Sequence, residues 1–182
     1  MKSDKKGISP VIATVFIIML TVAAVAVIAS FVVPFVKRAL YQSTECVPYK
    51  EFYDFEESFG YNCYQEEGNL YGASVKAGFD KTISQGLEGF DIVFIDEQGS
   101  TKKANVRDES AVSHEAGKIW LKGTLSGAAL RAPGAGETLT YIYNSSENSV
   151  FVSAEVYPVL KTGRICEKSA SIKIIKCTGN IG

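Results

Sequence analysis

The sequence has few of the residues that metal centres and most enzymes use. It contains one histidine, His114, and four cysteines at positions 46, 63, 166 and 177, with no C-x-x-C pair. A zinc site usually takes four Cys or His ligands in tight pairs, and these spacings do not supply them. The sequence therefore predicts no metal and no cofactor.

Catalytic motifs are also absent. His114 has Ser113 beside it, but neighbours in sequence rarely form a catalytic triad. There is no phosphate-binding G-x-x-x-x-G-K-S/T motif and no G-x-G-x-x-G after a predicted strand. We expect no catalytic residue and no enzyme activity.

The chain lacks a strong excess of positive charge. Its net charge is −1 and its sequence pI is about 5.9, whereas nucleic-acid binding proteins present a basic stripe. The composition thus predicts no nucleic-acid partner.

Charge is missing altogether from residues 7–36, which differ sharply from the rest of the chain. Between Val11 and Val33 only Thr14, Thr21 and Ser30 interrupt 20 apolar residues. A helix of this length and composition can cross a bilayer. Because it is apolar all round, it must be buried on every side, by lipid or by copies of itself. Pro34 should kink or loosen it near its end.

Three interpretations compete for this N-terminal region. A secretory signal could be cut before Ser30, but the apolar run continues past that point to Val33. A plain membrane anchor explains the lysines before the run by the positive-inside rule. Neither interpretation accounts for Gly7 and Pro10.

The third interpretation rests on the stretch Lys5-Lys6-Gly7 followed by Ile8-Ser9-Pro10. This stretch resembles the class III signal peptide of archaeal type IV pilins, in which a prepilin peptidase cuts after the glycine. Glycine leaves the bond open, Ser9 can cap the helix, and Pro10 suits its first turn. Bacterial relatives place a glutamate where this chain has Ile12, a departure that favours the archaeal family, and archaellins carry a glycine-rich start instead.

The resemblance implies a function and partners. The chain would be a membrane precursor that polymerises with itself through its helix into an extracellular filament for adhesion. A pilus assembly ATPase and a platform protein would be further partners. The alternative is a monomeric, membrane-anchored binding module on the cell exterior.

Beyond the helix the sequence predicts an α+β chain with an all-β, immunoglobulin-like sandwich head. Short runs rich in β-branched and aromatic residues alternate with turn signals. The expected strands are 70–78, 89–96, 101–107, 118–125, 137–143, 150–160 and 171–176. The expected divisions are a leader at 1–7, a helix at 8–42, a connector at 43–69 and the head at 70–182.

The connector 43–69 is rich in aromatic residues beside acidic ones. These rings either form an exposed patch for subunit contact or sugar stacking, or fill the flank of the head's core. The second interpretation is favoured, because Cys46 and Cys63 flank the segment.

In an exported chain the four cysteines predict two disulfides. Cys46 with Cys63 and Cys166 with Cys177 is the simplest of three pairings, and the sequence leaves all three open. Asn144 begins the sequon Asn144-Ser145-Ser146 in an expected turn, so it is a candidate for glycosylation.

Overall fold

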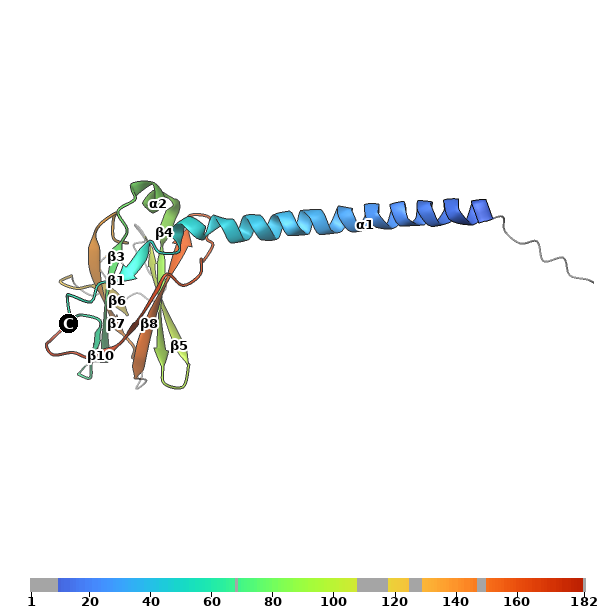
Figure 1. Cartoon of the computed structure of the whole chain (residues 1–182). Helices are drawn as coiled ribbons and strands as arrows, with labels where there is room; N and C mark the ends of the chain where they lie inside the picture. Colours follow the sequence, from blue (N-terminus) through green and yellow to red (C-terminus); the bar gives the residue numbers. More distant parts are fainter. Residues whose placement is uncertain (1–9, 68, 108–117, 125–128, 147–149, 182) are drawn as a thin grey trace, which may run out of the picture. The chain divides into compact units, whose positions relative to one another are not determined.

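The computed structural model describes residues 10–67, 69–107, 118–124, 129–146 and 150–181, with the backbone alone at 10 and 38–43. It divides between Glu45 and Cys46 into two units, a long helix and a mostly β head (Figure 1).

The helix α1 runs from Pro10 to Glu45, 36 residues without a break. It ends three residues beyond the predicted position and continues through Pro34, which was expected to kink or loosen it. Proline removes one backbone donor, but the turns on either side carry apolar residues and no glycine.

The first sheet contains the strands in the order β10-β2-β3-β7-β6, with β1 also paired to β3. Among the strand pairs that the structure describes in this sheet, β10–β2 alone is parallel. Its described strands are β1 (Tyr53–Phe55), β2 (Cys63–Gln65), β3 (Leu70–Ala77), β6 (Ile119–Leu121), β7 (Thr138–Asn144) and β10 (Ile175–Lys176).

The second sheet is antiparallel, in the order β5-β4-β8-β9. Its described strands are β4 (Leu87–Asp96), β5 (Thr101–Arg107), β8 (Phe151–Leu160) and β9 (Ala170–Lys173). The chain leaves this sheet at Ile174, which is buried, and enters the first sheet as β10. One continuous segment thereby links both sheets.

Two short helices complete the head: the 3₁₀ helix η1 (Val47–Tyr49) and α2 (Lys81–Gly86). Asp80 caps α2 by accepting hydrogen bonds from the backbone N–H groups of Thr82 and Ile83.

The two sheets pack face to face around an aromatic core. Phe94 of the second sheet stacks on Tyr143 of the first at 4.9 Å between ring centroids, and Phe90 meets Tyr141 edge-on at 5.4 Å. Each ring removes a large apolar area from water and adds a specific geometric preference. The core thus fixes how the strands of one sheet lie over the other.

The predicted combination of a long apolar helix and a two-sheet head is confirmed. The expected connector 43–69 differs: α1 extends into it, and β1 and β2 within it belong to the first sheet. The expected strand 118–125 is shorter, at Ile119–Leu121, and 171–176 is split between the two sheets.

Candidate functional site

The apolar surface of α1 is the most extended exposed feature of the molecule. Over Val11–Lys37 the helix is long and apolar enough to cross a membrane, and none of it is buried within the chain. Large side chains around its circumference, among them Phe16, Leu20 and Phe31, are about two-thirds exposed or more. Such a surface requires an apolar partner on all sides.

The three hydroxyl side chains within the apolar stretch of α1 form hydrogen bonds inside the helix. The hydroxyls of Thr14, Thr21 and Ser30 donate to the carbonyls three residues earlier, at 2.9, 2.8 and 2.7 Å. Placing a hydroxyl without such a hydrogen bond in an apolar environment would cost free energy. The helix therefore presents no unsatisfied hydroxyl at these three positions to lipid or to a neighbouring helix.

The residues of the predicted cleavage site fall mostly outside this description. Lys5, Lys6, Gly7, Ile8 and Ser9 lie beyond the described residues. Pro10 is the first described residue, and it lies in α1; the expected helix start at Ile8 lies outside the described residues. Cleavage itself stays a prediction.

All four cysteines form disulfides, as predicted, but the simplest pairing is wrong. Cys46 is bonded to Cys166 and Cys63 to Cys177. Sequence neighbours are not joined because late segments of the chain return to the early ones. β10 pairs with β2, which begins at Cys63, and Ser169 Oγ donates to the Tyr53 carbonyl of β1 at 2.6 Å. The two closed loops overlap along the chain.

The Cys46–Cys166 disulfide lies at the first residue of the head. Cys46 follows the last residue of α1 in sequence, and the backbone N–H of Cys166 donates to the Pro158 carbonyl in β8 at 2.9 Å. Any load carried by the chain at position 46 thus reaches the second sheet through a covalent bond.

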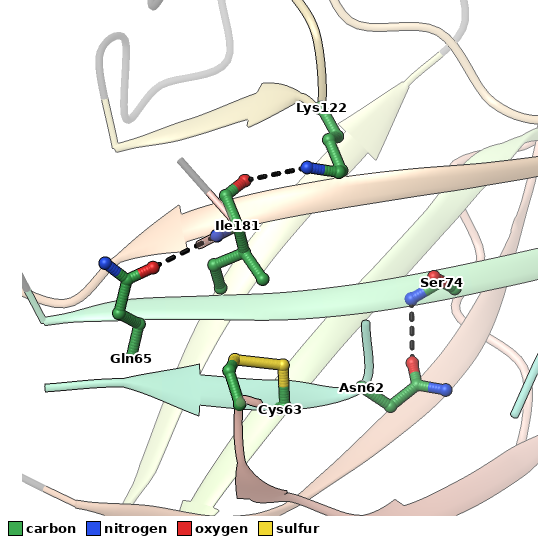
Figure 2. The surroundings of a disulfide bond; sticks show 7 residues. Asn62, Cys63, Gln65, Ser74, Lys122 and Ile181 are labelled. Atoms are coloured by element: carbon green, nitrogen blue, oxygen red, sulfur yellow. Dashed lines mark hydrogen bonds between the residues drawn. A yellow bond between two sulfur atoms is a disulfide. The ribbon is translucent and has the colours of Figure 1, made fainter. Parts of the chain in front are cut away.

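The Cys63–Cys177 disulfide holds the C-terminal segment on the outer face of the first sheet (Figure 2). There Cys63, Ile142 and Ile181 form a small apolar cluster separate from the main core. The Ile181 N–H donates to Gln65 Oε1 at 3.0 Å, and Lys122 Nζ donates to the Ile181 carbonyl at 3.4 Å. The segment is therefore held by covalent, apolar and polar contacts together.

The buried side chain of Asn62, next to Cys63, also holds this region in place. The Asn62 Oδ1 accepts from the Ser74 N–H at 2.8 Å, as Figure 2 shows, and its Nδ2 donates to the Glu56 carbonyl at 2.8 Å. Asn62 thereby satisfies two backbone groups that would otherwise be costly to bury.

The aromatic residues of the segment 43–69 divide between the two predicted roles. Phe52, Tyr53 and Phe55 are buried in the main core, as the favoured interpretation expected. Phe59 is 51% exposed and Tyr61 packs against the outer cluster. These two rings are on the solvent side of the first sheet.

Asn144 is the last residue of β7 and is half-buried. Its Oδ1 accepts from the Ser146 N–H at 3.0 Å, and Ser146 has a φ of 51°. The sequon thus sits in a local turn at a strand end, where the Asn144 side chain meets solvent in part. Glycosylation there stays a prediction.

The outer face of the second sheet holds a buried ion pair that the sequence analysis missed. Asp91 is 1% exposed, and its Oδ1 lies 2.6 Å from Arg107 Nη2, with Lys103 Nζ 3.4 Å from Oδ2. A buried carboxylate is tolerated only when charge and hydrogen bonds compensate it. These residues lie on adjacent strands, so only the register brings them together.

Further along this face, burial raises the pKa of the Glu155 carboxyl, but hydrogen bonds from Lys168 and Tyr157 together with the Lys168 charge lower it below its ordinary value. The hydrogen bond to Glu155 and then burial raise the pKa of Tyr157 to about 12. Both groups hold one charge state at neutral pH, so they stabilise structure and do not exchange protons.

Candidate catalytic and metal groups are not assembled in the described parts of the chain. Ser113 and His114 lie outside the described residues. No group of three or more His, Cys, Asp or Glu side chains arranged for a metal occurs among the residues the structure describes.

The fold and these features define a class: a chain with one helix suited to a membrane or to a bundle of like helices, followed by a disulfide-braced two-sheet domain. No family model and no curated protein matches the sequence. Two solved structures are similar at 14% identity. The archaellum periplasmic stator protein FlaG from Sulfolobus acidocaldarius aligns over 67% of this chain and 97% of its own, with a TM-score of 0.32.

The complex of the stator proteins FlaF and FlaG from the same organism aligns over 67% of this chain and 87% of the matched chain, with a TM-score of 0.31. Scores of this size do not decide the function of this chain.

Proposed function

We propose that this chain is a subunit of an archaeal type IV pilus-like surface filament, cut after Gly7 and assembled through α1, with the head carried outside for adhesion. The observation that carries the proposal is the exposed apolar surface around α1, with Thr14, Thr21 and Ser30 satisfied within the helix. Neighbouring helices would supply the burial that such a surface requires.

The disulfides support an exterior location for the head. Two bonds close loops across sequence separations of 120 and 114 residues, and bonds of this kind persist in oxidising surroundings. The resemblance of residues 5–10 to a pilin cleavage site supplies the step that releases the helix: removing Lys2, Lys5 and Lys6 takes away the charges that hold its end at the membrane face.

The test is the N-terminus of the protein purified from its own cells, read by sequencing and intact mass. We expect a chain that begins at Ile8, and sheared surface material that contains filaments of this chain by electron microscopy. A Gly7→Asp variant should keep its leader and give no filaments, whereas a matched Lys6→Arg variant should be cut and assembled normally. A native chain that begins at Met1 would favour the monomeric anchored module, and one that begins at Ser30 a secreted domain.

A further inference from the structure

A groove lies on the outer face of the first sheet, beside β6 and β7. Its volume is about 690 Å³, and its wall includes two aromatic rings, two cationic side chains and two threonines of β7: Phe59, Tyr61, Lys122, Arg131, Thr138 and Thr140. The register of β7 against β3 pairs Thr140 with Ser74 and Thr138 with Lys76. Leu139, which lies between them in sequence, packs against the main core, so both threonines point away from it. The Thr140 hydroxyl lies within hydrogen-bond distance of the Ser74 hydroxyl, at 2.8 Å.

The aromatic wall is held at a fixed distance from the sheet. Gly72 of β3 has no side chain, and a Cβ built there would lie 2.2 Å from the Tyr61 carbonyl oxygen. The backbone of Tyr61 thus lies directly on the sheet. Phe59 remains 51% exposed, although it belongs to the same short segment. The ring of Phe59 is available to a ligand without any rearrangement of the core.

The groove wall carries one cationic side chain that no described carboxylate neutralises, Lys122, in a chain whose net charge is −1. Lys122 Nζ lies 4.6 Å from the centre of the Tyr61 ring, and Arg131 pairs with Glu137 at its rim. No carboxylate belongs to the groove wall among the described residues. This local charge complements an anionic ligand.

We propose that this groove binds an acidic oligosaccharide, one that carries uronic acid or similar carboxylate sugars. The exposed ring of Phe59 packs against the apolar C–H face of a sugar ring. Threonine hydroxyls exchange hydrogen bonds with sugar hydroxyls, and Lys122, which lies over the Tyr61 ring, attracts the carboxylate. Concave sites of this size combine an apolar wall with a few polar groups in this way.

An acidic peptide that bound by strand addition would need a strand edge to pair with. The edge strand here, β6, offers three residues, which is a short template. The sugar ligand fits the rings and the hydroxyls, which an extended peptide would leave unused.

This inference deepens the proposed function by naming what the head recognises, and it rests on that function for the head's outward position. Binding and assembly are measured separately. Loss of filaments with binding intact would contradict only the filament, and intact filaments without binding would contradict only the groove.

The experiment is calorimetric titration of the full chain in detergent micelles with oligogalacturonate, followed in parallel by fluorescence of Trp120, the single tryptophan. We expect saturable binding that weakens with salt. Phe59→Ala should weaken it about tenfold, and Lys122→Gln should weaken it and reduce its salt dependence. The matched controls Phe79→Ala, at a ring that is 89% exposed outside the groove, and Lys173→Gln should bind as the parent does.

Thermal unfolding of each variant, matched to the parent within a few degrees, shows that the head remains folded. Absence of binding by the folded parent would overturn the proposal. Equal losses in the groove and control variants would overturn it too, as would equal affinity for a neutral galactose oligomer. Equal affinity for polyglutamate would show that the groove selects charge and not sugar, and would also overturn it.

Discussion

Gly72 occupies a position where even one methyl group has no room. A Cβ there would lie 2.2 Å from the Tyr61 carbonyl oxygen and 3.5 Å from the Ile181 side chain. Because the first neighbour is backbone, the segment must shift. We expect Gly72→Ala to lower the free energy of unfolding by about 1–3 kcal/mol, measured by urea denaturation. Gly179→Ala, with nothing within 4 Å of its Cβ, is the matched control. Equal stability of the two variants would contradict the close packing.

Glu137 is a second residue whose surroundings can be tested, here through pH. Its carboxylate accepts from Arg131 Nη1 at 2.6 Å and from the Gly134 N–H at 2.8 Å. The Arg131 hydrogen bond outweighs burial and lowers the pKa of Glu137 from 4.5 to about 2. A carboxyl group whose pKa is lower in the folded than in the unfolded chain stabilises the fold at pH values above its unfolded pKa. This contribution is lost as pH falls from 4.5 toward 2.

The corresponding measurement compares the parent with Glu137→Gln by denaturant unfolding at several pH values. Because the carboxylate is about one-third exposed, solvent screening reduces the expected difference to about 1 kcal/mol near neutral pH. The difference should shrink as pH falls toward 2 and as salt rises. If the difference in unfolding free energy stayed constant from pH 7 to pH 2, the ion pair between Glu137 and Arg131 would not be its cause.

Among the elements, long periodic segments were predictable from sequence and short ones were not. α1 follows from a nearly continuous apolar run. The strands β3, β4, β5, β7 and β8 follow from short segments that contain β-branched or aromatic residues and lie between turn residues. β1 and β2 are three residues each, too short to show a period. β1 is a strand because it pairs with β3, and β2 because it pairs with β3 and β10. The helix α2 did carry a local signal, since Asp80 precedes it as a cap.

Features that depend on register could not be predicted. Asp91 and Arg107 meet because β4 and β5 pair in a particular alignment, and sequence spacing does not reveal that alignment. The wall of the groove likewise joins Phe59 to Lys122 and Thr140 from distant parts of the chain. The cysteine pairing failed for the same reason: composition predicts disulfides, but only the sheet order selects the partners.

For the molecule as a whole, the overlapping disulfides set how far the chain can extend under force. From Cys46 to residue 182 the peptide is 136 residues long, but the bond to Cys166 leaves 16 residues between these ends. Without that bond, the Cys63–Cys177 disulfide leaves 22 residues between the same two ends, counted from Cys46 to Cys63 and from Cys177 to residue 182. Either disulfide alone therefore limits how far the head can be extended, which would suit the proposed filament under tension.

Single-molecule stretching between Cys46 and the C-terminus tests this arrangement directly. At about 3.5 Å per residue, the oxidised parent and the Cys63→Ser/Cys177→Ser variant should both extend by roughly 60 Å, and the Cys46→Ser/Cys166→Ser variant by roughly 80 Å. The fully reduced chain should reach roughly 480 Å. If cysteines close in sequence were paired instead, the oxidised parent would still keep 108 of these residues free, and would extend to roughly 380 Å. That long extension would contradict the crossed connectivity and the load path through both sheets that depends on it.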